Sequence, residues 1–169
     1  MDILKLSTEW AKAELFSAKI VWMFSFIVLL TAIGFAVLGK TAMARSYVIP
    51  LMVAAVFLIA VGIGLYAANR PRIAQFEQEY KKQAAAFVEK EIARATKSEG
   101  ELKLILKILP AIAIVAAIFL LFFSSEHIKA ISITLLLLVG FLMAVDSNTS
   151  ARNTAYRTEL LKYYERWQE

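Results

Sequence analysis

The distribution of charge constrains this chain more than any other feature. Residues 20–39, 48–68, 108–125 and 130–145 contain no Asp, Glu, Lys, Arg or His, and the charged residues lie between these stretches. A helix rises about 1.5 Å per residue, so roughly 20 apolar residues cross the ~30 Å hydrocarbon core of a bilayer. The pattern predicts an all-α, polytopic membrane protein with four spans. The fourth stretch is the shortest.

Two short connectors, 40–45 and 126–129, join the stretches in pairs. Links of this length connect antiparallel neighbours, so the spans are predicted to form two transmembrane hairpins. The expected organisation has five parts: an N-terminal amphipathic helix at 1–19, hairpin 1 at 20–68, a cytoplasmic helical segment at 69–107, hairpin 2 at 108–145 and a C-terminal cytoplasmic amphipathic helix at 146–169.

The basic residues predict an orientation. The segments before residue 20, between the hairpins and after residue 145 hold three, nine and four Lys and Arg, whereas the two connectors together hold three. Cytoplasmic segments carry the excess of basic residues. Both termini and the middle segment are therefore predicted to be cytoplasmic. This asymmetry also explains the net charge of +5 without a nucleic-acid partner.

The predicted cytoplasmic segments carry apolar residues at helical spacing. In 69–98 the spacing is three or four, apart from one step of five between Phe87 and Ile92, and it predicts one long amphipathic helix. Ser98 and Glu101 match a capping box that would begin a second helix. Such a stripe packs in a helical bundle or lies in the headgroup layer, and the bundle is favoured. The candidate interaction stripe comprises Ile73, Phe76, Tyr80, Phe87, Tyr156, Leu160, Tyr163 and Trp167.

An internal duplication is suggested by an offset of 84 positions. It aligns residues 57–61 (FLIAV) with 141–145 (FLMAV), and it pairs Asn69 with Asn153 and Tyr80 with Tyr164. Each half would then contain a hairpin followed by an amphipathic helix. Because both halves have the same orientation, a pseudo-two-fold axis along the membrane normal is expected.

The residue types present exclude several kinds of site. The chain has no cysteine and one histidine, His127, which rules out thiolate chemistry and multi-histidine metal sites. Ionisable residues within spans usually mark transport pathways, and these four stretches contain none. No catalytic residues and no cofactor are therefore predicted.

Two weaker patterns remain. Asp146 and Asn148 lie in a polar stretch after the fourth span, but the glycine and terminal acid of a calcium loop are missing, and a helix leaving the bilayer is the simpler interpretation. Ala60, Gly64 and Ala68 recur at every fourth position, a spacing that allows close helix packing. Packing within the chain is favoured over a dimer contact.

Several stretches resemble a family of uncharacterised small bacterial inner-membrane proteins with four transmembrane helices. They are TEWAKAE at 8–14, AFV at 86–88 with EIAR at 91–94, AISIT at 130–134, and VDSN at 145–148 followed by Ala151, Arg152, Ala155 and Tyr156. The resemblance implies a multi-pass protein of the bacterial inner membrane. It implies no activity.

The sequence favours a non-enzymatic membrane scaffold or regulatory protein that makes contacts through its cytoplasmic helices. An oligomeric ion channel is the alternative, although Ser25, Thr31, Ser132 and Thr134 offer little polar lining for a pore. An immunity protein against a membrane-targeting toxin is a further alternative. The expected partners are the lipid bilayer, other copies of the chain, or another membrane or cytoplasmic protein.

Overall fold

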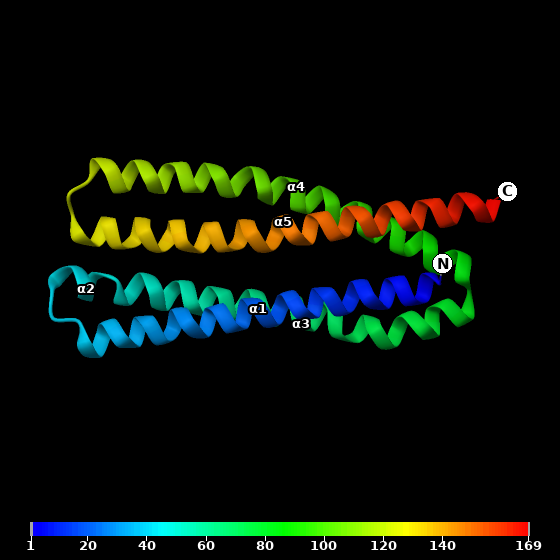
Figure 1. Ribbon diagram of the computed structural model, residues 1–169, viewed down its shortest axis with the longest axis horizontal. Coiled ribbons are helices and arrows are strands. Elements are labelled where there is room, and N and C mark those ends of the chain that lie inside the picture. Colours follow the sequence, from blue (N-terminus) through cyan, green and yellow to red (C-terminus); the bar gives the residue numbers. More distant parts are fainter. Residues whose placement is uncertain (1, 169) are drawn as a thin grey trace. The chain divides into compact units, whose positions relative to one another are not determined.

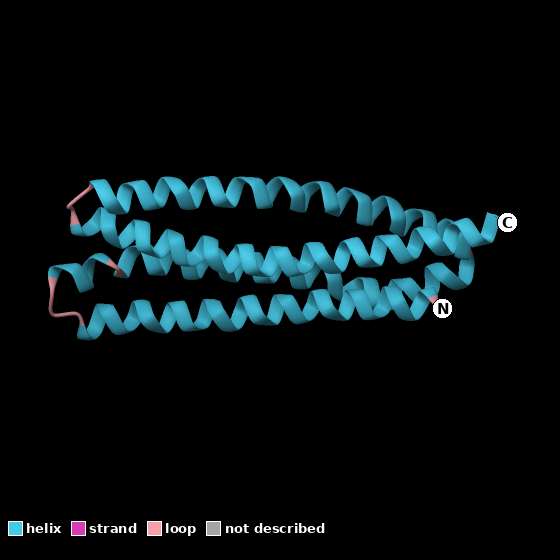
Figure 2. Cartoon of the chain, turned by 45° about the horizontal axis from the view of Figure 1, so that its top comes forward, coloured by secondary structure: helices cyan, strands magenta, loops and turns pink. Residues whose placement is uncertain are grey.

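The computed structural model describes residues 2–168, and every regular element in that range is an α-helix (Figure 2). In chain order the helices are α1 (Ile3–Leu38), α2 (Ala42–Ser46), α3 (Val48–Lys82), α4 (Ala84–Phe122) and α5 (Glu126–Gln168) (Figure 1). Four of these helices are long and apolar enough to cross a membrane. Each contains most or all of one of the four stretches identified in the sequence.

Local capping explains where the first helices begin. The Asp2 carboxylate accepts the backbone N–H of Leu4 at 3.0 Å at the start of α1. The Thr41 hydroxyl accepts the N–H of Ala44 at 3.1 Å at the start of α2. Side chains of this kind satisfy backbone donors that have no partner within the first turn. Neither α1 nor α5 is interrupted where an amphipathic segment was expected to meet a span.

The chain reverses at Gln83, between α3 and α4. Phe87 contacts Phe76 and Tyr80 edge to face, with ring centroids 5.5 and 5.7 Å apart. An uninterrupted helix would separate residues 76 and 87 by about 16 Å. The prediction of one long helix across residues 69–98 is therefore wrong: the segment forms two helix ends that pack against each other.

The second predicted boundary, the capping box at Ser98, is also wrong. Residues Ser98, Glu99, Gly100 and Glu101 lie inside α4, which continues to Phe122. Glu99 instead accepts a hydrogen bond from Lys103 at 2.7 Å, one turn further along. A Ser-x-x-Glu sequence caps a helix only where the backbone before it is non-helical, and here the preceding turn is already helical.

The helices divide into two compact units. Within the described chain, unit 1 contains 2–17, 64–106 and 145–168, and unit 2 contains 18–63 and 107–144. Unit 1 therefore combines the beginnings of α1 and α4 with the ends of α3 and α5. Unit 2 contains the rest of these helices, together with α2 and both short connectors.

Unit 2 exposes an unusual amount of apolar surface. All but four of the large apolar side chains that the structure shows exposed belong to unit 2; the four are Phe16, Leu104, Ile105 and Trp167. Inside the unit, small residues allow close contacts. A Cβ on Gly62 would overlap the indole ring of Trp22, so α1 and α3 approach closely there. The rings of Phe24 and Phe141 stack with centroids 3.8 Å apart and connect α1 with α5.

Candidate functional site

Unit 1 is organised around an apolar core to which all four of its helix segments contribute. Its buried members are Ile3, Trp10, Ala11, Phe76, Phe87, Val88, Ala95, Tyr156 and Leu160. Most of the predicted interaction stripe is part of this core: Phe76, Phe87, Tyr156 and Leu160 are buried, and Ile73, Tyr80 and Tyr163 pack against them. Trp167 is the exception, with half of its surface exposed. The stripe thus packs mainly against itself.

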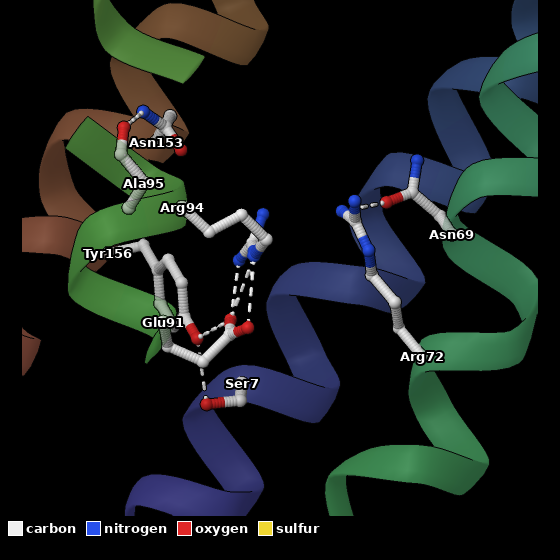
Figure 3. A network of polar contacts seen from close by, with 8 residues as sticks. All are labelled: Ser7, Asn69, Arg72, Glu91, Arg94, Ala95, Asn153 and Tyr156. Carbon is white, nitrogen blue, oxygen red and sulfur yellow. Dashed lines mark hydrogen bonds and ion pairs between the residues drawn. The ribbon is translucent and has the colours of Figure 1, made fainter. Parts of the chain in front are cut away.

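A carboxylate, Glu91, lies within this core with 2% of its surface exposed. Arg94, one turn along α4, donates to both of its oxygens, with Nε 3.0 Å from Oε1 and Nη2 2.5 Å from Oε2. The Tyr156 hydroxyl of α5 donates to Oε2 at 2.7 Å (Figure 3). Ser7 of α1 lies 2.8 Å from the same hydroxyl. The tyrosine proton is given to Glu91, so Ser7 donates to the tyrosine oxygen. The cluster connects α1, α4 and α5.

Aromatic rings hold the arginine of this cluster. The Arg94 guanidinium lies 4.0 Å from the centre of the Trp10 ring, and Trp10 stacks on Tyr156 with centroids 5.3 Å apart. Arg72 of α3 lies over the same indole at 5.9 Å. A cation above an aromatic face is attracted by the ring quadrupole, and more strongly when water is excluded. Trp10 therefore connects all four helix segments of unit 1.

The environment shifts three pKa values in this cluster. Burial raises the pKa of Tyr156 well above its ordinary value, and the charge of Glu91 adds to the effect. Burial lowers the pKa of Arg72, and the neighbouring Arg94 charge lowers it further. For Arg94, burial acts to lower the pKa, but the hydrogen bonds and charge of Glu91 reverse this and raise it. At neutral pH the tyrosine is a neutral donor and both arginines are charged.

A second buried ion pair connects α1 and α5. Glu14, 4% exposed, accepts a hydrogen bond from Nη2 of Arg152 at 2.9 Å, and Ser17 Oγ lies 2.8 Å from the same nitrogen. The Nε of Arg152 is buried and has no hydrogen-bond partner among residues 2–168. Nearby, burial and the Glu14 charge raise the pKa of Asp146.

Two buried asparagines occupy positions 84 residues apart. The Asn153 side chain donates to the Ala95 carbonyl of α4 at 2.8 Å, which adds a contact between α4 and α5 (Figure 3). Asn69 donates to the Leu65 carbonyl one turn earlier in its own helix, and its oxygen accepts a hydrogen bond from Arg72 at 2.9 Å. The two amides therefore differ in use: one connects two helices, and the other orients an arginine beside Trp10.

The buried groups serve structure more directly than reaction chemistry. Both buried carboxylates are held by arginine, so their oxygens are already occupied by hydrogen bonds within the chain. Within residues 2–168 no three or more His, Asp or Glu side chains are grouped so as to hold a metal ion. A general base or nucleophile needs a free lone pair that faces a substrate. The lone pairs of Glu91 instead face Arg94 and Tyr156, which donate hydrogen bonds to them.

The position of Glu91 in the sequence is itself a signal for this cluster. Glu91 lies at the step of five between Phe87 and Ile92, where a position four residues after Phe87 would complete the apolar stripe. A single acid on the buried face of an amphipathic helix, three residues before an arginine, indicates a buried ion pair. Glu14, four residues after Trp10, is likewise a single acid on the buried face of its helix, although no arginine follows it three residues later. No comparable sequence pattern indicates that Tyr156 and Arg152 are their partners.

The structure does not bring the two weaker candidates together into sites. Asp146 is half-buried and Asn148 is exposed, and both lie within α5 rather than in a loop. Residues two apart point to different sides of a helix. Ala60, Gly64 and Ala68 are all exposed, and a Cβ on Gly64 would meet no atom within 4 Å. The prediction that these three pack within the chain is wrong.

Comparison with known proteins identifies no relative. No protein-family model, no curated protein and no solved structure matches this chain.

Proposed function

We propose that the chain is a multi-pass protein of the bacterial inner membrane with cytoplasmic termini. The exposed apolar surface of unit 2 supports insertion, because soluble monomers rarely expose contiguous apolar patches above a few hundred Å². The sixteen-to-three distribution of basic residues supports the orientation, in which unit 1 is cytoplasmic. The bacterial assignment depends on the sequence resemblance alone.

Its function, in this proposal, is that of a non-enzymatic scaffold or regulatory protein. The observation that carries it is the pairing of Glu91 with Arg94 and Tyr156, because this commits the most buried acid of unit 1 to holding helices together. Removing one partner of a buried ion pair is strongly destabilising, so the pair favours one arrangement of these helices. A defined cytoplasmic surface is what a scaffold presents to a partner.

The contact surface proposed for a partner includes Trp167. Its ring is half exposed and lies 5.8 Å from that of Tyr163, which packs against the core. Tryptophan is enriched among the residues that dominate protein interfaces. The remainder of the stripe is occupied internally, so contacts through the cytoplasmic helices would use their outer faces and this end of α5.

A photo-crosslinking experiment in native membranes tests the scaffold role. A crosslinking amino acid at position 167 is expected to give one discrete adduct, and the same amino acid at exposed position 165 is a matched control. The same crosslinked products from positions 167 and 165 would contradict the proposal.

A flux measurement separates this role from the channel alternative. The hydroxyls of Ser25 and Thr31 donate to carbonyls in their own helix, at 2.7 and 2.8 Å, so they are already used. Proteoliposomes with the purified full chain are therefore expected to retain their ions. Selective conduction would overturn the scaffold proposal in favour of a channel.

We also propose that the two halves arose by duplication. Helices α1 and α4 end at Leu38 and Phe122, 84 residues apart, and buried positions recur at this offset. The buried pairs include Ile3 with Phe87, Ser7 with Glu91, Ala11 with Ala95, and Asn69 with Asn153. Insertion of each half alone into membranes, followed by association of the separately expressed halves, would support this origin.

A further inference from the structure

Unit 2 contains a groove of about 540 Å³ between the first part of α3 and the first part of α5. This volume lies within the range of small-molecule sites, about 300–1,000 Å³. Apolar side chains form most of its walls, among them Val53, Phe57, Ile131, Leu135 and Leu138. A groove of this composition fits a hydrocarbon chain.

Cationic and hydrogen-bonding groups lie at one end of the groove. Arg45 and His127, from the two short connectors, both line it and are both exposed. The Nε of Arg45 donates to the Gly39 carbonyl at 3.2 Å, which fixes the guanidinium plane. A guanidinium recognises phosphate through paired hydrogen bonds, and an imidazole adds a further donor. This end is suited to an anion.

A buried hydroxyl inside the groove has no partner. Thr134 lines the groove, is 5% exposed, and its Oγ1 makes no hydrogen bond to any described residue. Thr31, in comparison, donates to its own helix at 2.8 Å. A buried polar group without a partner is destabilising, so Thr134 is suited to a ligand oxygen. It lies seven residues from His127, about 10 Å along the helix.

We propose that this groove binds one anionic glycerophospholipid. The phosphate contacts Arg45 and His127, an acyl chain lies along Val53, Phe57 and Leu135, and an ester carbonyl accepts the Thr134 hydroxyl. The lipid is assigned an anionic headgroup because Arg45 at this end of the groove is cationic. A second copy of the chain fits less well, because its four apolar stretches carry no acid and its connectors carry only Glu126.

Native mass spectrometry of the delipidated full chain tests the assignment. The probes are phosphatidylglycerol and phosphatidylcholine with identical acyl chains, added separately to the protein in detergent. Phosphatidylglycerol is expected to be retained as a single adduct, at least about tenfold more tightly than phosphatidylcholine, because both lipids offer a phosphate to Arg45 but the choline cation of phosphatidylcholine is repelled there. Equal retention of both lipids would overturn the proposal.

Two pairs of variants locate the site. Arg45→Ala should lose most of the preference for phosphatidylglycerol, whereas Lys40→Ala, which removes the same charge from the same connector, should keep it. Val53→Trp fills the groove and should abolish the adduct, whereas Val56→Trp, on the same helix and similarly exposed, should not. Equal effects within either pair contradict the assignment. A dimer that Val53→Trp dissociates would show that a second copy occupies the groove, which also overturns it.

Discussion

The two units of this protein are held together by different means, although the same four long helices pass through both. In unit 1, a buried acid, two arginines and stacked rings connect the helices through directional contacts. In unit 2, the helices are connected by the close approach at Gly62 and by stacked phenylalanines, with little polar contribution. Polar contacts specify one arrangement, whereas apolar packing depends on shape. The comparison predicts that the units respond to different substitutions.

The largest effect is expected for Glu91→Ala. It removes the acceptor of Arg94 and Tyr156 and leaves a mostly buried cation unpaired, which should lower the free energy of unfolding by about 3–5 kcal/mol. The measurement is thermal unfolding in detergent, followed by circular dichroism. Glu77→Ala, which removes an exposed partner of Lys81, is the control and should leave stability nearly unchanged, because exposed ion pairs contribute little. Similar losses in both variants would refute the structural role of the buried pair.

Tyr156→Phe is expected to have the next largest effect. It removes the donor to Glu91 and the acceptor of Ser7, so a loss of about 1–3 kcal/mol follows at neutral pH. Because burial raises the pKa of Tyr156, its contribution is complete below the ordinary tyrosine pKa of about 10 and is lost as the pH rises above it. The variant should therefore lose less stability than the native chain between pH 9 and 11. A parallel decline of both proteins in alkaline unfolding curves would count against this interpretation.

In unit 2, the corresponding test concerns space. Gly62→Ala places a methyl group against the Trp22 indole, and the ring must shift away from its present contacts. We expect a loss of about 1 kcal/mol, the lower end of overpacking effects, because a side chain rather than backbone has to move. Gly140→Ala meets no atom within 4 Å and gains helix propensity, so it should be neutral or stabilising. Resistance to unfolding in sodium dodecyl sulfate would distinguish the two variants.

The smallest expected effect is the difference in stability loss between serine-to-alanine variants of the two units. Ser25 donates to the Trp22 carbonyl of its own helix, and Ser25→Ala should change stability by about 0.5 kcal/mol or less. Ser7→Ala leaves the Tyr156 oxygen with one fewer donor and should cost about 1 kcal/mol. If the order of the two losses were reversed in chemical unfolding, the distinction between the units would fail.

The sequence predicts the helices better than it predicts which residues pack against each helix. Each apolar stretch lies in its own helix, because twenty residues without charge have few alternatives. The reversal at Gln83 was missed because no glycine or proline marks it, and tertiary contacts of Phe87 determine it. The stripe predicted the presence of a buried face but could not identify what would cover it. Glu91 and Glu14 could have been found from their positions on that face, whereas Tyr156 and Arg152 are identified only by the packing.

The distribution of unit 1 over the chain has a consequence for synthesis. Its helix segments lie before, between and after the parts of the chain that form unit 2, and Arg152, Asn153 and Tyr156 all follow the fourth apolar stretch. During translation, Glu14 is therefore made long before Arg152, and the pair formed by Glu91 and Arg94 is made long before Tyr156. A chain made as far as residue 149 contains all four apolar stretches but neither Arg152 nor Tyr156. Unit 1 can therefore close its core only after the spans have been made.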